Sequence, residues 1–294
     1  MKNSKLAGWF FVLLLAVLAA GFWKISRRSA ATPILSPANV QATGVQKSAG
    51  VKAAAEVGAL TSQSPVAVKE FRDWAQAYQQ AAPSERSALE IQGAELARAH
   101  TRAIATLIRQ DPEQAIASAV PMVIRQDLPP GIVDLLEKRV SLKAALNVYG
   151  NVPLPGAEAS PDFEPYTRSV TTDDGGHWNA FVYGKRLGQR TLTKASINGI
   201  SVGADMAIAD TPARTLEIGE RPQVAGREVV EVCPVSGKTT SVERTATGDL
   251  PEVTEETPAI ETAERVIFVC SGGHIERVVE QLSEEEEREH WESL

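Results

Sequence analysis

The stretch Arg168-Ser-Val-Thr-Thr-Asp-Asp-Gly-Gly-His-Trp-Asn-Ala-Phe-Val-Tyr183 decides the fold of the central part of the chain. Two β-prone runs flank four turn residues, Asp-Asp-Gly-Gly, which tolerate the positive φ angles of tight hairpin turns. The stretch therefore predicts a β-hairpin. Further β-prone runs, broken by glycine or proline, follow at residues 191–200, 202–208 and 214–218. We expect a small antiparallel β module over residues 148–226.

Upstream of this module, apolar residues recur with helical spacing. Phe71, Trp74 and Tyr78 lie at positions i, i+3 and i+7, which places them on one face of a helix. Proline or N-cap residues mark the starts of three further helices, at Ser84, Asp111 and Pro129-Pro130. Because no repeat period is present, we expect a small helical bundle over residues 67–147 rather than a repeat array, with the aromatic residues in its core.

The N-terminal part of the chain predicts a membrane anchor. Residues 6–23 are eighteen uncharged residues, and as a helix they would extend roughly 27 Å, close to the thickness of the bilayer core. Cleavage after Val17-Leu-Ala19 is the alternative, but the apolar run continues past it to Trp23. We expect an uncleaved signal-anchor within residues 1–28, with the bulk of the chain extracytoplasmic, although basic residues on both flanks leave the orientation open. Residues 29–66 have the composition of a disordered linker.

Charge and composition exclude several functional classes. The 294 residues include 30 basic and 37 acidic ones, a net charge of −7, and a nucleic-acid-binding protein needs surplus Lys and Arg. Gly237-Lys238-Thr239 imitates the end of a phosphate-binding loop, but the leading glycine of that motif is replaced by Val232. We therefore expect neither nucleic acid nor a nucleotide as a partner. The residues from Glu243 onward include 15 acidic and 4 basic ones, an excess that predicts a solvated face, with a docking tail as the alternative.

The chain has two cysteines, Cys233 and Cys270, which are 37 residues apart. Export to an oxidising compartment favours a disulfide between them, and two unpaired thiols are the alternative. A third interpretation makes Cys270 a nucleophile whose pKa is lowered by a helix N-terminus and by His274. No orienting Asn or Asp accompanies this pair, so we expect no enzyme and no catalytic residue.

Two stretches resemble known families. Residues 67–220 resemble the N-terminal accessory region of large exported bacterial proteins, some of which have metallopeptidase domains downstream. The resemblance lies in four short stretches, at residues 183–189, 193–194, 197–200 and 211–217. That resemblance implies an export-side module without catalytic residues. The chain contains no His-Glu-x-x-His motif, so it implies no peptidase activity here.

Cys233-Pro-Val-Ser-Gly237 and Phe268-Val-Cys-Ser-Gly-Gly-His274 resemble, over residues 228–285, the YHS or TRASH type of metal-associated domain. The resemblance implies a hairpin-plus-helix, treble-clef-like module over residues 227–294. It also implies Cys233, Cys270 and His274 as ligands of zinc or copper, with Ser236 in the place of a further cysteine. Three ligands are one short of a closed zinc site.

The sequence therefore predicts an α+β protein with an anchor, a linker, a helical module, a β module and a Cys/His-bearing module. We expect a non-enzymatic, membrane-tethered binding or scaffolding protein with a disulfide between Cys233 and Cys270. The membrane contact is residues 6–23, and the protein partner is unknown. Thiophilic metal binding and thiol chemistry at Cys270 are the alternative functions.

Overall fold

The chain is an α+β protein. The computed structural model describes residues 66–153, 156, 163–224, 226–242 and 250–292, all within one compact unit, Ala49–Leu294. Helices and strands are both present, so the expected fold class is confirmed. The predicted anchor and linker up to residue 65 lie outside the described residues. Within the described part of the chain, no helix combines the length and the apolar character that crossing a membrane requires.

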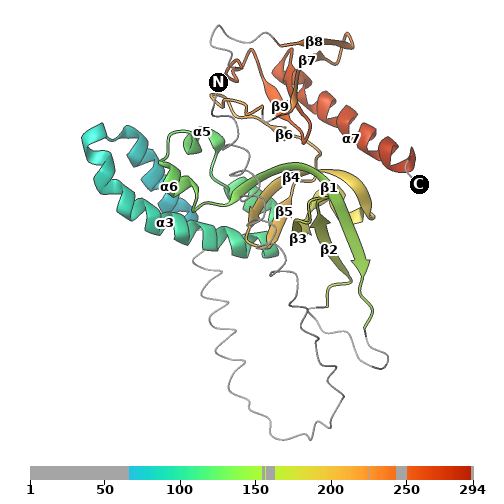
Figure 1. Cartoon of the computed structure of the whole chain (residues 1–294), viewed down its shortest axis with the longest axis horizontal. Helices are drawn as coiled ribbons and strands as arrows, with labels where there is room; N and C mark the ends of the chain where they lie inside the picture. The colour runs from blue at the N-terminus through green and yellow to red at the C-terminus, as the bar shows by residue number, and fades with distance from the viewer. Residues whose placement is uncertain (1–65, 154–155, 157–162, 225, 243–249, 293–294) are drawn as a thin grey trace, which may run out of the picture. The chain divides into compact units, whose positions relative to one another are not determined.

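The first described elements are helical (Figure 1). A helix covers residues 66–80, and four more follow: α3 (Pro83–Gln110), α4 (Pro112–Ser118), α5 (Met122–Arg125) and α6 (Pro130–Val133). As predicted, Phe71, Trp74 and Tyr78 share a buried face and form the centre of this core. Ser84 is not an N-cap: α3 begins one residue earlier with Pro83, whose fixed φ suits the first helical position. The N-cap at Asp111 is confirmed, because its Oδ1 accepts a 2.9 Å hydrogen bond from the Gln114 N–H.

The helical region ends earlier than expected. Strand β1 (Lys138–Gly150) begins ten residues before the predicted boundary at residue 148. Val140, Leu142, Ala144 and Leu146 alternate with other residues and contribute to the core of the β module. This period of two, typical of a strand, overrides the helical spacing that the residues after Pro130 suggest.

Strand β1 belongs to a closed barrel with the strand order β1-β2-β3-β5-β4. The other strands are β2 (Tyr166–Thr171), β3 (His177–Val182), β4 (Leu192–Val202) and β5 (Asp205–Ile208). The predicted hairpin is β2–β3, with Val170 opposite Trp178. The module is not wholly antiparallel, because β3 and β5 pair in parallel. Strand β1 pairs with both β2 and β4, and five strands closed in this order make a Greek-key barrel of the OB type.

A second sheet, with the order β6-β9-β10-β7-β8, carries the two cysteines. Its strands are β6 (Arg214–Thr215), β7 (Glu228–Cys233), β8 (Lys238–Ser241), β9 (Ala259–Glu261) and β10 (Arg265–Val269). A 3₁₀ turn, η2 (Gly272–His274), then leads into α7 (Ile275–Glu292). Strand β6 comes from residues expected in the β module, yet it joins this second sheet, where Arg214 pairs with both Glu220 and Glu261. The predicted boundary at residue 226 therefore does not separate the two sheets.

Candidate functional site

The parallel pairing of β7 with β10 brings the two cysteines together. Val232 and Val269 are the last residue pair of this ladder. Cys233 is the final residue of β7, and Cys270 directly follows β10. The Cys270 N–H donates to the Val232 carbonyl at 3.4 Å. Both thiols are free, Cys233 is half-buried and Cys270 is exposed. We call Cys233, Ser236, Cys270 and His274 the dithiol site.

The turn between β7 and β8 surrounds the Cys233 sulfur with hydrogen-bond donors. The Gly237 N–H donates to the Cys233 carbonyl at 2.9 Å, and Gly237 has a φ of +67°, which favours glycine at this position. This tight turn places the Ser236 hydroxyl and the N–H groups of Val235 and Ser236 near the sulfur. Ser236 stands where the resembling family has a cysteine, and here its hydroxyl contacts the thiol instead.

These donors make the two thiols chemically unequal. Hydrogen bonds from the Ser236 side chain and backbone, then from the Cys270 side chain, lower the pKa of the Cys233 thiol to about 6. The hydrogen bond to Cys233 raises the pKa of the Cys270 thiol, because Cys270 must keep its proton in order to donate it. The pKa of the Cys233 thiol is therefore lower than that of the Cys270 thiol. The sequence interpretation expected a lowered pKa at Cys270, whereas the pKa is raised at Cys270 and lowered at Cys233.

His274 lies on the other side of Cys270. Its Nδ1 is 3.3 Å from the Cys270 Sγ, because η2 turns the chain back before α7 begins. Cys270 thus lies beside Cys233 and contacts the imidazole of His274, just ahead of the N-terminus of an 18-residue helix. All three residues that the sequence singled out are therefore brought together.

The site does not present the geometry of a metal centre. No group of three or more His, Cys, Asp or Glu side chains among the described residues is arranged to hold a metal ion. The fourth position holds Ser236, a much weaker ligand than a thiolate for zinc or copper. Metal binding therefore gains no support from the geometry and stays a prediction of the sequence.

A second feature, which sequence reasoning missed, is a groove of about 990 Å³ between the barrel and α7. Its lining includes three exposed apolar side chains, Tyr166, Leu187 and Trp291. It also includes three basic side chains, Arg168, Lys185 and Arg190, and three acidic ones, Asp210, Glu286 and Glu287. We call this feature the barrel groove. No sequence signal could have found it, because its two walls are about 100 residues apart in the chain.

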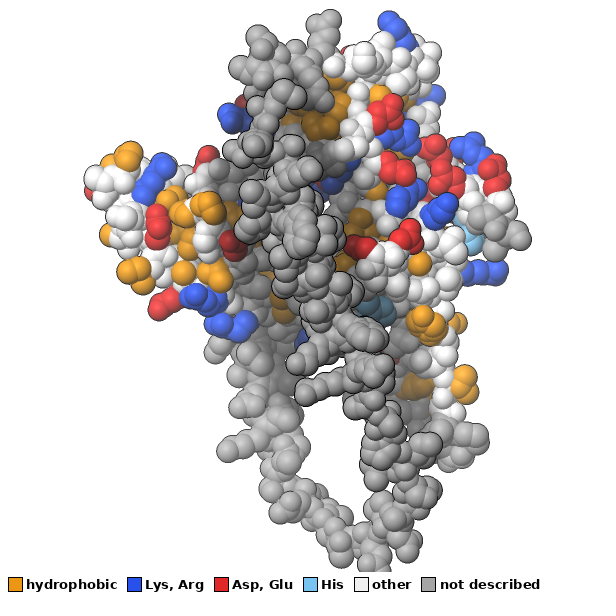
Figure 2. Space-filling view, viewed as in Figure 1, with side chains coloured by type: hydrophobic (Ala, Val, Ile, Leu, Met, Phe, Trp, Pro, Cys, Tyr) orange, Lys and Arg blue, Asp and Glu red, His pale blue; other side chains and the backbone are white. Residues whose placement is uncertain are grey.

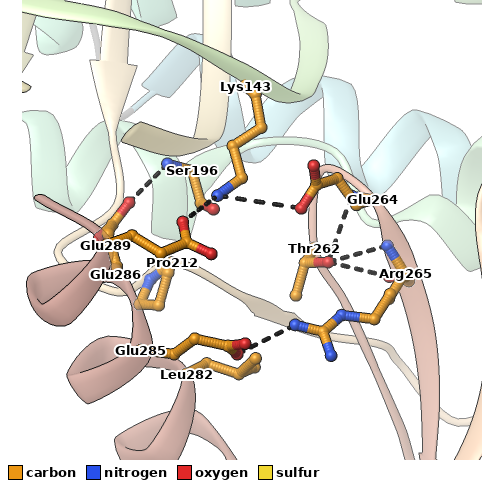
Figure 3. Close-up of a pocket in the computed structure, with 10 residues that line it drawn as sticks. All are labelled: Lys143, Ser196, Pro212, Thr262, Glu264, Arg265, Leu282, Glu285, Glu286 and Glu289. Carbon is orange, nitrogen blue, oxygen red and sulfur yellow. Dashed lines mark hydrogen bonds and ion pairs between the residues drawn. The ribbon is translucent and has the colours of Figure 1, made fainter. Parts of the chain in front are cut away.

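The acidic run that the sequence predicts as a solvated face fastens α7 to its surroundings. Glu286 accepts a hydrogen bond from the Ser196 N–H and lies 3.8 Å from the Arg186 guanidinium. Figure 3 shows Lys143 between Glu264 and Glu289, and Arg265 directed towards Glu285. Basic and acidic side chains are also interspersed over the α7 side of the face in Figure 2. Part of the excess acidity is thus paired within the fold.

Comparison of the chain with protein-family models, with curated proteins and with solved structures gives no match. Both family resemblances therefore remain expectations, and the function has to be argued from the dithiol site and the barrel groove.

Proposed function

We propose that this protein is a membrane-tethered, extracytoplasmic, non-enzymatic binding protein whose C-terminal module is closed by a Cys233–Cys270 disulfide. The observation that carries this proposal is the position of the two cysteines, one residue beyond the paired Val232 and Val269 at the ends of neighbouring strands. Adjacent side chains on paired strands have the short separation that a disulfide requires.

Export to an oxidising compartment would allow the two neighbouring cysteines to form a disulfide. A signal-anchor at residues 6–23 would deliver the chain to a compartment where disulfides form and persist. The bond would close a loop of 37 residues between β7 and β10, and closing such a loop restricts the unfolded chain. A small sheet that begins with a two-residue strand, β6, benefits from such a constraint.

The barrel groove supplies the binding surface of this proposal. Tyr166 and Trp291 offer aromatic contact area, and aromatic residues are enriched in protein interfaces. Lys185 and Arg190 add positive charge on the barrel wall, whereas the acidic lining residues Glu286 and Glu287 lie on α7. The occupant we propose is an extended segment of a partner protein that combines apolar with acidic side chains.

The disulfide is tested by intact mass. The full-length chain, made in an exporting host and alkylated during lysis, is weighed after denaturation and compared with the Cys233→Ser variant. We expect the mass of wild type to be two hydrogens below the mass of its own reduced sequence, and we expect it to take up no alkylating label. The Cys233→Ser variant should take up one label, at Cys270. A chain that instead retains zinc or copper on reduced thiols in native mass spectra, and loses it on His274→Ala, would replace this proposal with the metal-binding alternative.

The tether and the groove are tested separately. Carbonate extraction should leave the chain in the membrane, and removal of residues 1–28 should release it. Synthetic peptides that alternate leucine and glutamate should bind the full-length chain, and Trp291→Ala should weaken binding about tenfold or more, as expected for a central aromatic contact. Ile91→Ala, an exposed apolar residue of α3, is the matched control and should bind as wild type does. Equal binding by both variants contradicts the proposed surface.

A further inference from the structure

The barrel groove has three basic side chains that the fold leaves without an acidic partner. They are Arg168 on β2, Lys185 on the 3₁₀ helix η1 (Gly184–Gly188), and Arg190, which follows η1. Among the described residues, no carboxylate forms an ion pair with any of the three. Their charge is therefore available to a ligand in the groove.

Two of the three acidic lining residues interact with a buried cation, Arg186. Burial lowers the pKa of Arg186, and the charges of Glu286 and Asp210 oppose that effect. Glu286 also lies 3.8 Å from the Arg186 guanidinium. Glu287 is the remaining acidic lining residue, and it is exposed on α7. The barrel wall of the groove therefore keeps a surplus of positive charge.

Arg168 differs from the other two because the barrel holds its side chain in place. Its Nη2 donates a 2.8 Å hydrogen bond to the Leu187 carbonyl, and its guanidinium carbon lies 5.8 Å from the centroid of the Tyr166 ring, a cation–π distance. Within the described part of the chain this is its only hydrogen bond. A guanidinium has five N–H donors, so most of the donors of Arg168 have no acceptor in the fold.

Tyr166 provides an apolar surface beside this charge. Tyr166 and Arg168 are two residues apart on β2, so their side chains leave the same face of the strand. Gly150 is the cross-strand neighbour of Tyr166 on β1, and a Cβ at Gly150 would meet nothing within 4 Å. No side chain of this neighbour covers Tyr166, which is 55% exposed. Strand β2 thus presents a cation and an aromatic ring side by side.

We infer that Arg168 is the specificity-determining residue of the barrel groove: it binds a carboxylate of the partner segment, while Tyr166 contacts a neighbouring apolar side chain of the same segment. This inference rests on the proposed function and deepens it, because it assigns the selection of acidic side chains to one residue. A basic segment would be repelled at this position, and a neutral one would leave the charge of Arg168 unpaired. The groove therefore discriminates against both.

Arginine suits this role better than lysine would. A planar guanidinium binds a carboxylate through two parallel N–H groups and also stacks on an aromatic ring, whereas a lysine ammonium is a point charge. Lys185 and Arg190 are exposed, so their attraction for an acidic segment is screened by salt. We expect Arg168 to set the selectivity and the other two to add affinity that depends on ionic strength.

The test exchanges the charge at position 168 and the charge of the ligand. The probes are two synthetic peptides of equal length, one alternating leucine with glutamate and the other leucine with lysine, and the receptor is the immobilised full-length chain. Wild type should bind the glutamate peptide about tenfold or more tightly than the lysine peptide, as expected for a charge-assisted hydrogen bond. Arg168→Glu should weaken binding of the glutamate peptide and strengthen binding of the lysine peptide. Arg168→Lys should keep the preference of wild type but bind the glutamate peptide more weakly.

Arg98→Glu is the matched control, because Arg98 is an exposed basic residue of α3 and its replacement changes the net charge by the same amount. It should leave both affinities within about twofold of wild type. Arg168→Gln removes the charge and keeps an amide donor for the Leu187 carbonyl, so it should lose the preference while its melting temperature shows that the fold is retained. Equal effects of Arg98→Glu and Arg168→Glu would overturn the inference, because the preference would then follow net charge and not position.

This inference and the proposed function fail in different measurements. If wild type binds both peptides equally and Trp291→Ala weakens both, the groove stands as the binding surface and selection by Arg168 is overturned. If wild type binds neither peptide, the proposed occupant and the role of Arg168 are both overturned. A dimer in native mass spectra that Arg168→Glu dissociates would assign the groove to a second copy of the chain, and would also overturn the inference.

Discussion

Arg186 lies fully buried beneath α7, and the carboxylate of Glu286 is 3.8 Å from its guanidinium. The arginine also donates to the carbonyls of Ala209 and Ser196, both at 2.7 Å, so the barrel fixes its position. Glu286 is thus the point at which the C-terminal helix meets a cation inside the barrel wall. Together with the ion pair between Lys143 and Glu289, this contact holds the α7 wall of the barrel groove against the barrel.

Glu286→Ala should release this contact. The variant leaves the Ser196 N–H and the Arg186 guanidinium without their carboxylate, and we expect the free energy of unfolding to fall by about 2–4 kcal/mol. Amide hydrogen exchange over residues 275–292 should rise. Glu287→Ala, an exposed position on the same helix, is the control and should stay within about 0.5 kcal/mol of wild type. Equal effects of the two variants would show that Glu286 does not fasten the helix.

Glu137 should make stability depend on acid pH. Burial alone would raise the pKa of this carboxyl, but the hydrogen bond with His100 and the charge of Arg125 outweigh it, so the pKa lies below its ordinary value of 4.5. A carboxyl with a depressed pKa stabilises the fold fully above its unfolded pKa, and the stabilisation is lost as pH falls through the folded value. Glu137→Gln should therefore cost about 3 kcal/mol at pH 7, and the difference from wild type should shrink below pH 4.5.

Urea denaturation at pH 7 and at pH 3 measures both quantities. Glu95→Gln, an exposed position on α3, serves as the control and should follow wild type at both pH values. If the Glu137→Gln deficit is the same at the two pH values, the carboxylate is not the stabilising species.

The parts of the fold that could be predicted are those set by local sequence. The aromatic face of residues 71–78, the Asp111 N-cap and the β2–β3 hairpin each depend on residues close together in the chain. The start of β1 was missed, because Val140 and Leu142 fit both a helical and an alternating pattern over a short window. The sequence could not predict that β6 belongs to the second sheet. That placement depends on contacts between distant residues, such as the ion pair of Arg214 with Glu261, which are 47 residues apart in the chain.

The candidate site shows the same division. Cys233, Cys270 and His274 could be selected from the sequence, because few residue types carry such chemistry. The sequence could not predict which thiol has the lower pKa, because that depends on the position of the Ser236 hydroxyl near Cys233 in the hairpin turn. Ser236 looked like a lost metal ligand in the sequence, and in the structure it is a hydrogen-bond donor.

Gly93→Ala should destabilise the helical core even though alanine favours helices. A Cβ at position 93 would lie 2.1 Å from Cζ2 of Trp74, so the indole or α3 must move. Overpacking of this kind costs about 1–3 kcal/mol, more than the helix propensity gained, and Trp74 fluorescence should change. Gly131→Ala in α6 is the matched control, because a Cβ there meets nothing within 4 Å. A loss of stability in Gly131→Ala as large as in Gly93→Ala would contradict the steric explanation.

The melting temperature of the chain should depend on the oxidation state of Cys233 and Cys270. The proposed disulfide would close a loop of 37 residues, and the entropy removed from the unfolded chain predicts a melting temperature roughly 10 °C higher for the oxidised protein than for the reduced one. Differential scanning calorimetry with and without dithiothreitol measures the difference. The double variant Cys233→Ser/Cys270→Ser should melt at the temperature of the reduced protein and should not respond to the reductant. If wild type melts at the same temperature in both states, the bond strains the ends of β7 and β10 by as much as it constrains the unfolded chain.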